Sequence, residues 1–307
     1  MTSPLQSQSE EIESAEPGRR SQWVGWLPIL VLPLTAVLCR NLVSSWVFMW
    51  TLSFAIFASL KWLTWWRART QVSHPAWRSI AYLLAWPGMD ADTFLDASQC
   101  VPPPSSTAWL WATLQTVFGA ILLWIVARSL PAVEPLLRGW TGMLGLILLL
   151  HFGSFQLIAL LWQTFGVKAR PIMSAPLRST SLAEFWGKRW NLGFRQLSYD
   201  LIFRPLHRTL GAQAAGLLVF LASGLIHDLV ISLPARAGYG LPTAYFLVQG
   251  AGITIEHTRF GKQLGLGGGA QGWLFMAVFV AGPAFWLFHP WFVLRVILPF
   301  MQAIHAL

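Results

Sequence analysis

The sequence is poor in charged residues. Lys, Arg, Asp and Glu make up 11% of the 307 residues, whereas a soluble domain carries about 25%. A soluble monomer, a disordered chain and a nucleic-acid-binding domain are therefore poor fits, even though the formal net charge is +9. Hydrophobic residues make up 55% of the chain. This composition predicts a polytopic membrane protein.

Motifs for metal binding and for covalent catalysis are also absent. The two cysteines, Cys39 and Cys100, are too few for a disulfide framework. No His-x-x-x-His or Cys-x-x-Cys pair occurs, so we expect no metal and no other bound cofactor. No Gly-x-Ser-x-Gly elbow is present, which argues against an acyl-enzyme. We expect no signal peptide, because the first apolar stretch begins late.

Long apolar stretches are what the sequence has in abundance. A helix needs about 20 apolar residues to cross a bilayer. Stretches of nearly this length cover residues 22–39, 42–60, 107–127, 139–161, 214–233, 241–257, 272–289 and 291–306. We therefore expect an all-α protein with about eight transmembrane helices in one domain, residues 22–307, after a polar tail of residues 1–21. Whether the last stretch crosses fully stays open, since only His289-Pro290 separates it from the one before.

The positions of the cations predict the orientation. If the N-terminus lies inside, the inside segments hold sixteen Lys and Arg residues and the outside segments hold four. Cytoplasmic loops carry such an excess, so we expect both termini to be cytosolic. Two inside loops, residues 61–106 and 163–213, are long, and long loops tend to be functional.

The residue pattern of segment 163–213 predicts a basic amphipathic helix that lies in the cytosolic membrane interface. Ser181 and Glu184 have the spacing of a capping box, so we expect a helix from Leu182 onward. Apolar residues recur along one face, and Glu184, Lys188, Asn191 and Arg195 recur along another. One interpretation is a simple membrane-surface anchor. The other is a docking face for an anionic, phosphate-bearing ligand, because Asn191 lies between two cations and an amide adds little to membrane attachment.

One histidine stands out among seven. His227 lies about 20 Å along its predicted span, inside the bilayer core, where ionisable residues are usually functional. It is followed by a second costly residue, Asp228. A neutral imidazole is a suitable general base for a hydroxyl group. The alternative is a buried histidine that only hydrogen-bonds a neighbouring helix. For His151 we prefer this second, purely structural interpretation. Three further histidines lie near span ends, where a polar side-chain tip is tolerated: His257, His289 and His305.

Two stretches resemble a known family. Ser181-Leu-Ala-Glu-Phe-Trp-Gly-Lys-Arg-Trp-Asn191 is similar to the Phe-Trp-Gly-Arg-Arg-Trp-Asn signature of wax synthases, in the membrane-bound O-acyltransferase superfamily. Ser223-Gly-Leu-Ile-His227-Asp resembles their Ser-Gly-x-x-His-Glu stretch. Lys188 and Asp228 depart from the usual Arg and Glu. Two further stretches, Tyr82–Asp90 and Leu287–Pro299, are similar to bacterial wax-synthase-like sequences, which implies a bacterial inner membrane.

The resemblance implies a fold, a reaction and a set of site residues. It implies a helical core around a tunnel, in which a fatty acyl group passes from acyl-CoA to the hydroxyl of a lipid or long-chain alcohol. By resemblance His227 is the catalytic base, and Asn191 positions the acyl donor or the attacking oxygen. Residues expected to bind acyl-CoA are Trp186, Lys188, Arg189, Trp190 and Arg195.

Several alternatives stay open at this point. An intramembrane His-Asp pair also suits a proton-coupled transporter of lipids or small molecules. Glu256-His257 at the end of a span forms either a proton relay with His227 or, as we prefer, an interface pair. The identity of the acceptor, the acyl chain length and the oligomeric state do not follow from the sequence.

Overall fold

All regular structure in the described residues, 23–307, is helical. The coordinates are a computed structural model. The predicted tail, residues 1–21, lies outside the described residues. The all-α class predicted from the composition is confirmed.

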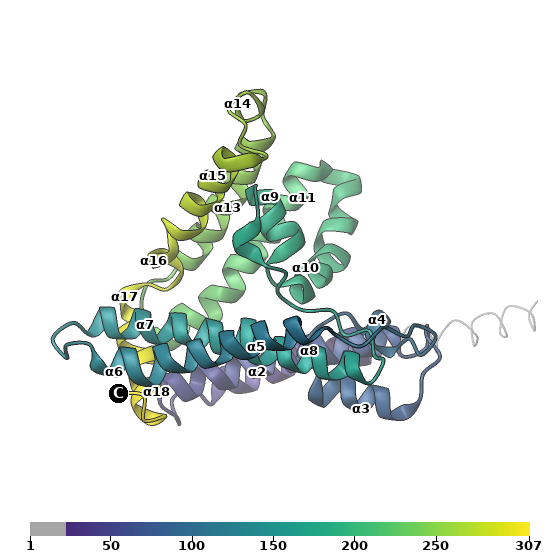
Figure 1. Ribbon diagram of the computed structural model, residues 1–307, viewed down its shortest axis with the longest axis horizontal. Coiled ribbons are helices and arrows are strands. Elements are labelled where there is room, and N and C mark those ends of the chain that lie inside the picture. The colour runs from purple at the N-terminus through teal and green to yellow at the C-terminus, as the bar shows by residue number, and fades with distance from the viewer. Residues whose placement is uncertain (1–22) are drawn as a thin grey trace, which may run out of the picture.

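The first half of the chain forms one layer of long helices. Helix Trp23–Leu38 precedes α2 (Ser45–Ala68), α3 (Ala76–Ala85) and α4 (Ala91–Leu95). Two long helices follow, α5–η1–α6 (Ser106–Ser129) and α7–η2–α8 (Pro135–Thr164), each interrupted by a π-helical turn. Figure 1 shows α2, α5 and α7–α8 running along the long axis of the molecule.

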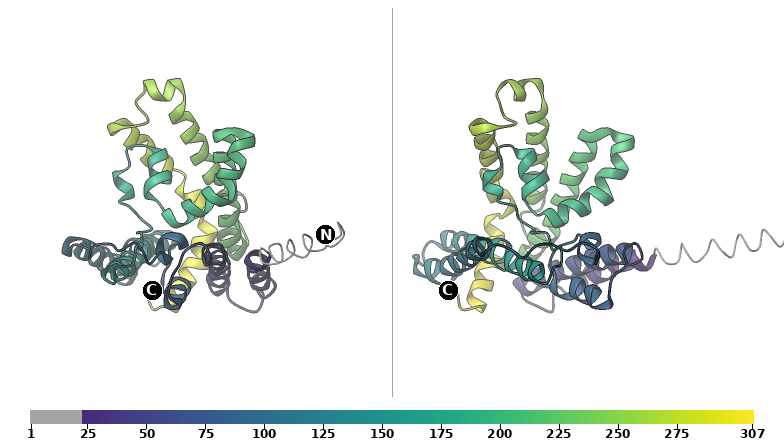
Figure 2. Two further views of the ribbon diagram at one scale, coloured as in Figure 1. Left: turned by 90° about the vertical axis from the view of Figure 1, so that its right-hand side faces the viewer. Right: turned by 45° about the vertical axis from the view of Figure 1, so that its right-hand side comes forward.

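The second half rises steeply from this layer. It begins with the short elements η3 (Pro176–Arg178), α9 (Leu182–Glu184), η4 (Phe185–Arg189), α10 (Leu192–Ser198) and η5 (Tyr199–Phe203). The longer helices α11 (Arg204–His227), α13 (Leu241–His257) and α15 (Gly269–Ala281) follow, with η6 (Asp228–Ser232), α12 (Leu233–Ala235) and α14 (Arg259–Gln263) between them. The chain then returns through α16 (Ala284–Leu287), α17 (Pro290–Phe292), η7 (Val293–Ile297) and α18 (Leu298–Ala303). Figure 2 shows α11 and α13 diverging as they leave the layer.

Each of the eight predicted spans coincides with a helix, but their lengths differ. Five described helices are long and apolar enough to cross a membrane: Ser45–Ala68, Ser106–Ser129, Pro135–Thr164, Leu192–Ala235 and Gly269–Leu287. Trp23–Leu38, Leu241–His257 and Pro290–Ala303 are shorter. The chain is an integral membrane protein, and the count of eight crossings stays a prediction.

Small residues let the long helices of the layer approach closely. A Cβ on Gly119 of α5 would lie 2.5 Å from the backbone nitrogen of Leu149 and 2.8 Å from the carbonyl oxygen of Gly145. No side chain fits between these two helices at that point. Small residues have this role at many helix crossings in membranes.

Lys61 corrects the count of loop cations. We placed it in the inside loop 61–106, but α2 continues to Ala68 and buries Lys61 to 1% exposure. Its ammonium group donates to the carbonyl of Gly88 and lies 3.3 Å from the centroid of the Tyr82 ring. Lys61 therefore ties α2 to the loop before α4. Without Lys61, the inside loops still hold many more Lys and Arg residues than the outside loops.

The tunnel implied by the resemblance stays a prediction. A cavity of about 290 Å³ lies at the turn beside α12, between Arg40, Arg236 and Tyr239. None of the predicted site residues lines it. It is therefore a different feature from the expected meeting place of the two substrates.

Candidate active site

The predicted amphipathic helix over residues 182–197 is broken at its centre. Helix α9 passes into the π-helical turn η4, which ends at Arg189, and α10 starts only at Leu192. Trp190 is extended, and Asn191 has φ 45° in the left-handed region. The prediction of one helix with Lys188, Asn191 and Arg195 on one face is therefore wrong. The left-handed residue reverses the chain between the two short helices.

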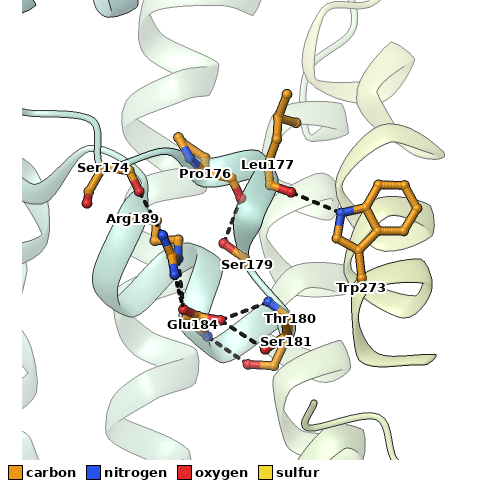
Figure 3. Close-up of polar contacts among 9 residues, drawn as sticks. All are labelled: Ser174, Pro176, Leu177, Ser179, Thr180, Ser181, Glu184, Arg189 and Trp273. Carbon is orange, nitrogen blue, oxygen red and sulfur yellow. Dashed lines mark hydrogen bonds and ion pairs between the residues drawn. The ribbon is translucent and has the colours of Figure 1, made fainter. Parts of the chain in front are cut away.

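The start of this segment forms as predicted. The Ser181 hydroxyl oxygen accepts a 3.0 Å hydrogen bond from the Glu184 backbone N–H, which caps α9. The Glu184 carboxylate accepts from the Thr180 backbone N–H at 2.8 Å and pairs with the Arg189 guanidinium at 2.6 Å (Figure 3). These contacts, with the Thr180 hydrogen bond as the largest cause, lower the pKa of Glu184. The charge of Arg189 is thus committed to an internal pair.

Glu256 of α13, which is distant in sequence, holds the N-terminus of α9. It is only 5% exposed, and its carboxylate accepts from the backbone N–H of Leu182 at 2.7 Å and of Ala183 at 3.3 Å. A carboxylate is stabilising at a helix N-terminus, where N–H groups lack partners. Glu256 therefore binds α13 to α9. His257 is exposed and bonds the Ile253 carbonyl of its own helix. Glu256 and His257 thus have separate partners and neither contacts His227, so the relay does not form, and a location of the pair at the membrane interface stays a prediction.

The remaining cations of the segment are freely accessible. Lys188 and Arg195 are exposed, and Arg195 lies 5.9 Å from the Tyr199 ring centroid. Asn191 is partly buried, and its side-chain amide has no hydrogen-bond partner among the described residues. Its backbone N–H points at the Met173 sulfur, 3.3 Å away. The amide is therefore free to bind a ligand.

A second loop packs against the Asn191 turn. The backbone nitrogen of Met89 lies 3.2 Å from the position of a Cβ on Gly193, and Gly88 lies next to it. Gly88 is the residue whose carbonyl holds Lys61. The Tyr82–Asp90 stretch, singled out by resemblance, thus supports the backbone of the Trp-Asn segment.

The imidazole of His227 has one fixed and one free nitrogen. Nδ1 lies 2.7 Å from the carbonyl oxygen of Ser223, one turn earlier in α11. A carbonyl oxygen only accepts hydrogen bonds, so Nδ1 carries the proton in this contact. In the neutral ring Nε2 then holds an open lone pair, and no described residue bonds it. This is the tautomer that a general base requires.

Aromatic rings connect His227 to the Trp-Asn segment. The Phe246 ring of α13 lies 4.4 Å from the imidazole, centroid to centroid, and 5.6 Å from the Trp186 ring. The Trp186 indole N–H donates to the side-chain oxygen of Gln249, which is fully buried. Trp190 lies 6.4 Å from Trp186. His227 and Trp186, far apart in sequence, therefore both pack against the same phenylalanine ring.

Asp228 has its hydrogen-bond partners outside this cluster. Its carboxylate accepts from the backbone N–H of Gly240 at 2.8 Å and from the backbone N–H of Thr243 at 3.2 Å, as well as from the Thr243 hydroxyl. It caps the N-terminus of α13. The adjacent Gly224 allows this contact, since a Cβ there would lie 2.6 Å from the Thr243 Cα. Asp228 therefore sets the position of α11 along α13.

His151 does not have the partner that a structural histidine usually has. Its ring lies 5.5 Å from Phe155, and its buried Nδ1 has no hydrogen-bond partner among the described residues. The next residue, Phe152, lies 6.2 Å from Trp190. The expectation of a hydrogen-bonded buried histidine is therefore wrong for this atom.

Sequence comparisons match the part of the chain that contains these residues. Residues 169–248 match the model of the membrane bound O-acyl transferase family. A probable long-chain-alcohol O-fatty-acyltransferase 7 of Arabidopsis thaliana is 30% identical over 141 residues, 41% of this chain. The long-chain-alcohol O-fatty-acyltransferase of Simmondsia chinensis is 30% identical over 102 residues, 30% of this chain. An acyl-CoA–sterol O-acyltransferase 1 of Arabidopsis thaliana is 27% identical over 143 residues, also 41% of this chain.

Over residues 169–248 the chain is similar to the membrane bound O-acyl transferase family. The matched segment contains the Trp-Asn stretch, His227, Asp228 and Phe246. The aligned parts cover 40%, 29% and 39% of the three relatives, so this chain spans less than half the length of each of them. The relatives are plant proteins, and a bacterial origin stays a prediction.

Sequence reasoning missed Phe246 and Gln249 at this site, and it gave Glu256 a different role. Phe246 and Gln249 are ordinary members of an apolar helix in the sequence, and only their contacts with His227 and Trp186 distinguish them. Glu256 carries a signal, because a carboxylate in an apolar stretch needs a partner. The sequence does not say that this partner is a backbone more than 70 residues away.

Proposed function

We propose that this chain is an acyl-CoA-dependent O-acyltransferase that esterifies the hydroxyl group of a lipid or long-chain alcohol. The observation that carries the proposal is the His227 imidazole, whose Nε2 lone pair is open while Phe246 and Trp186 connect it to the Trp-Asn segment. The names of the relatives, which specify long-chain alcohols and a sterol, support this class of acceptor.

The chemistry is a direct transfer. Nε2 of His227 takes the proton of the acceptor hydroxyl as its oxygen attacks the thioester carbonyl carbon. A C–O bond forms, the C–S bond breaks, and the CoA thiolate leaves and recovers the proton from the imidazolium. The free amide of Asn191 donates a hydrogen bond to the donor or to the attacking oxygen. The acyl-CoA phosphates meet the exposed Lys188 and Arg195.

We further propose that segment 163–213 faces the cytosol. Acyl-CoA is water-soluble at its nucleotide end and reaches the site from that side, while the lipid acceptor enters from the bilayer. The excess of inside cations supports this orientation. This orientation places both chain ends in the cytosol. The proposal also includes that the membrane is a bacterial inner membrane.

The test is an acyl-transfer assay on the purified chain in detergent. It supplies labelled palmitoyl-CoA with a panel of acceptors: a long-chain alcohol, diacylglycerol and a sterol. We expect an ester of one of them and equimolar CoA release. A folded protein that binds no acyl-CoA and makes no ester with any acceptor contradicts the proposal. Proton-driven uptake into sealed vesicles without an acyl donor would then support the transporter instead.

A further inference from the structure

His289 is the most deeply buried histidine that the proposed reaction does not use. From its position at the end of a predicted span we expect a polar side chain at the membrane interface, but the side chain of His289 is 0% exposed. Nδ1 accepts a 3.1 Å hydrogen bond from the backbone N–H of Phe292 and so caps α17. An acceptor nitrogen carries no proton, so the proton of His289 is on Nε2. This is the opposite tautomer to that of His227.

The protonated nitrogen of His289 begins a relay of hydrogen bonds. Nε2 lies 3.4 Å from the hydroxyl oxygen of Ser232, the longest contact of the relay. Ser232, also 0% exposed, lies 2.8 Å from an Asp228 carboxylate oxygen and 3.2 Å from the Gly238 carbonyl. Its single proton favours the shorter, charge-assisted bond to Asp228. The direction of donation thus runs from His289 through Ser232 to Asp228.

Serine, histidine and aspartate in contact do not form a nucleophilic triad here. Ser232 lies between the other two residues, whereas a triad places the histidine in the middle. The histidine nitrogen facing Ser232 already bears a proton and cannot accept another. These residues therefore hold one another in place.

What they hold is the register of α11 on α13. Asp228 caps α13 through Gly240 and Thr243, and α13 carries Phe246 against His227. A shift of Asp228 therefore moves the base relative to the ring beside it. Displacements of about 1 Å are enough to impair catalysis by up to about a hundredfold.

We propose that His289 is a positioning residue for His227, acting through Ser232 and Asp228. The predicted effect on turnover rests on the proposed function, but the effect on the placement of His227 does not. The residue lies more than 60 positions away from the base along the chain, in the stretch Leu287–Pro299 for which neither the fold nor the reaction yet gives a role.

Two substitutions separate this role from simple helix capping. In His289→Asn the side chain still accepts from Phe292, because asparagine is a good N-cap, but it lacks the atom that reaches Ser232. Ser232→Ala removes the middle of the relay and leaves the cap intact. The matched control is His305→Asn, at an exposed residue with φ 56°, since asparagine tolerates the left-handed region.

We expect both variants to lower kcat for ester formation by about tenfold with KM for acyl-CoA nearly unchanged, since the binding residues are intact. The double variant should lose no more than either single one, because the two residues act as one unit. The control should keep the wild-type rate. If only His289→Asn loses activity and Ser232→Ala does not, the relay is refuted. If His289→Asn does not fold, Ser232→Ala decides alone.

A second readout needs no activity. Diethyl pyrocarbonate modifies unprotonated imidazole nitrogens, and peptide mass spectrometry follows its reaction with His227. We expect the rate at His227 to change by about threefold or more in both variants, because local packing controls access, and to be unchanged in His305→Asn. Unchanged reactivity of His227 in both variants overturns the inference. If the wild type makes no ester, the proposed function fails and this rate still decides the role of His289.

Discussion

At the scale of single residues, Asn191 has two properties that are separable by mutation. Its backbone is left-handed, with φ 45°, a conformation that costs most residues about 1 kcal/mol or more but costs glycine nothing. Its amide has no partner among the described residues. The first property builds the turn between α9–η4 and α10, and the second is available for a substrate.

Asn191→Gly keeps the turn and removes the amide. We expect its melting temperature to stay near that of the wild type while acyl transfer falls roughly tenfold or more, the worth of one hydrogen bond to a polarised group. Asn191→Ala should lose both stability and rate. Thermal unfolding and initial rates, measured on the same preparations, check this. A wild-type rate in Asn191→Gly would mean that Asn191 has only a conformational role.

At the scale of elements, the close crossing of α11 and α13 determines where His227 lies. Gly224 leaves no room for a side chain opposite Thr243, whereas Gly216, two turns earlier in α11, has nothing within 4 Å of its Cβ position. The two glycines belong to the same helix and differ only in what faces them. They therefore form a matched pair for testing the crossing.

Gly224→Ala should destabilise the protein by about 1–3 kcal/mol, because the added methyl group meets backbone that cannot move freely. Gly216→Ala should be neutral or stabilising by up to about 1 kcal/mol, because alanine favours helices. Tryptophan fluorescence during thermal unfolding in detergent measures both. Equal melting temperatures for the two variants would show that α11 and α13 do not pack this closely.

The elements also show what the sequence is able to predict. The Ser181 cap and the positions of the eight apolar helices follow from local patterns, and they form as expected. The break at Asn191 does not follow, because the spacing of Trp186, Trp190 and Phe194 is the same whether or not the helix continues. The remaining parts of the site depend on contacts between segments that are distant in sequence, and no local pattern contains these contacts. Examples are the hydrogen bonds from the α9 backbone to Glu256 and the contact between His289 and Ser232.

At the scale of the whole molecule, the orientation in the membrane positions the site for its donor. The predicted topology places Cys39, beside Arg40, on the outside and Cys100, in the loop 61–106, in the cytosol. Both cysteines are free and exposed. The chain thus carries a natural label on each predicted side.

The variants Cys39→Ser and Cys100→Ser each leave one cysteine for a membrane-impermeant maleimide. In inside-out vesicles we expect labelling of Cys100 and not of Cys39, because the excess of Lys and Arg places loop 61–106 inside. Right-side-out vesicles should give the reverse pattern. Labelling of both cysteines from the same side contradicts the topology.

The central claim concerns one atom, Nε2 of His227, and the most direct measurement is the initial rate of ester formation by His227→Ala. Removal of a general base lowers the rate by about 10²–10⁴-fold, so we expect a loss in this range with folding and acyl-CoA binding retained. The matched control is His257→Ala, at an exposed histidine that likewise bonds a carbonyl of its own helix, and it should keep the wild-type rate. Ester formation by His227→Ala within a few-fold of the wild-type rate would contradict the account.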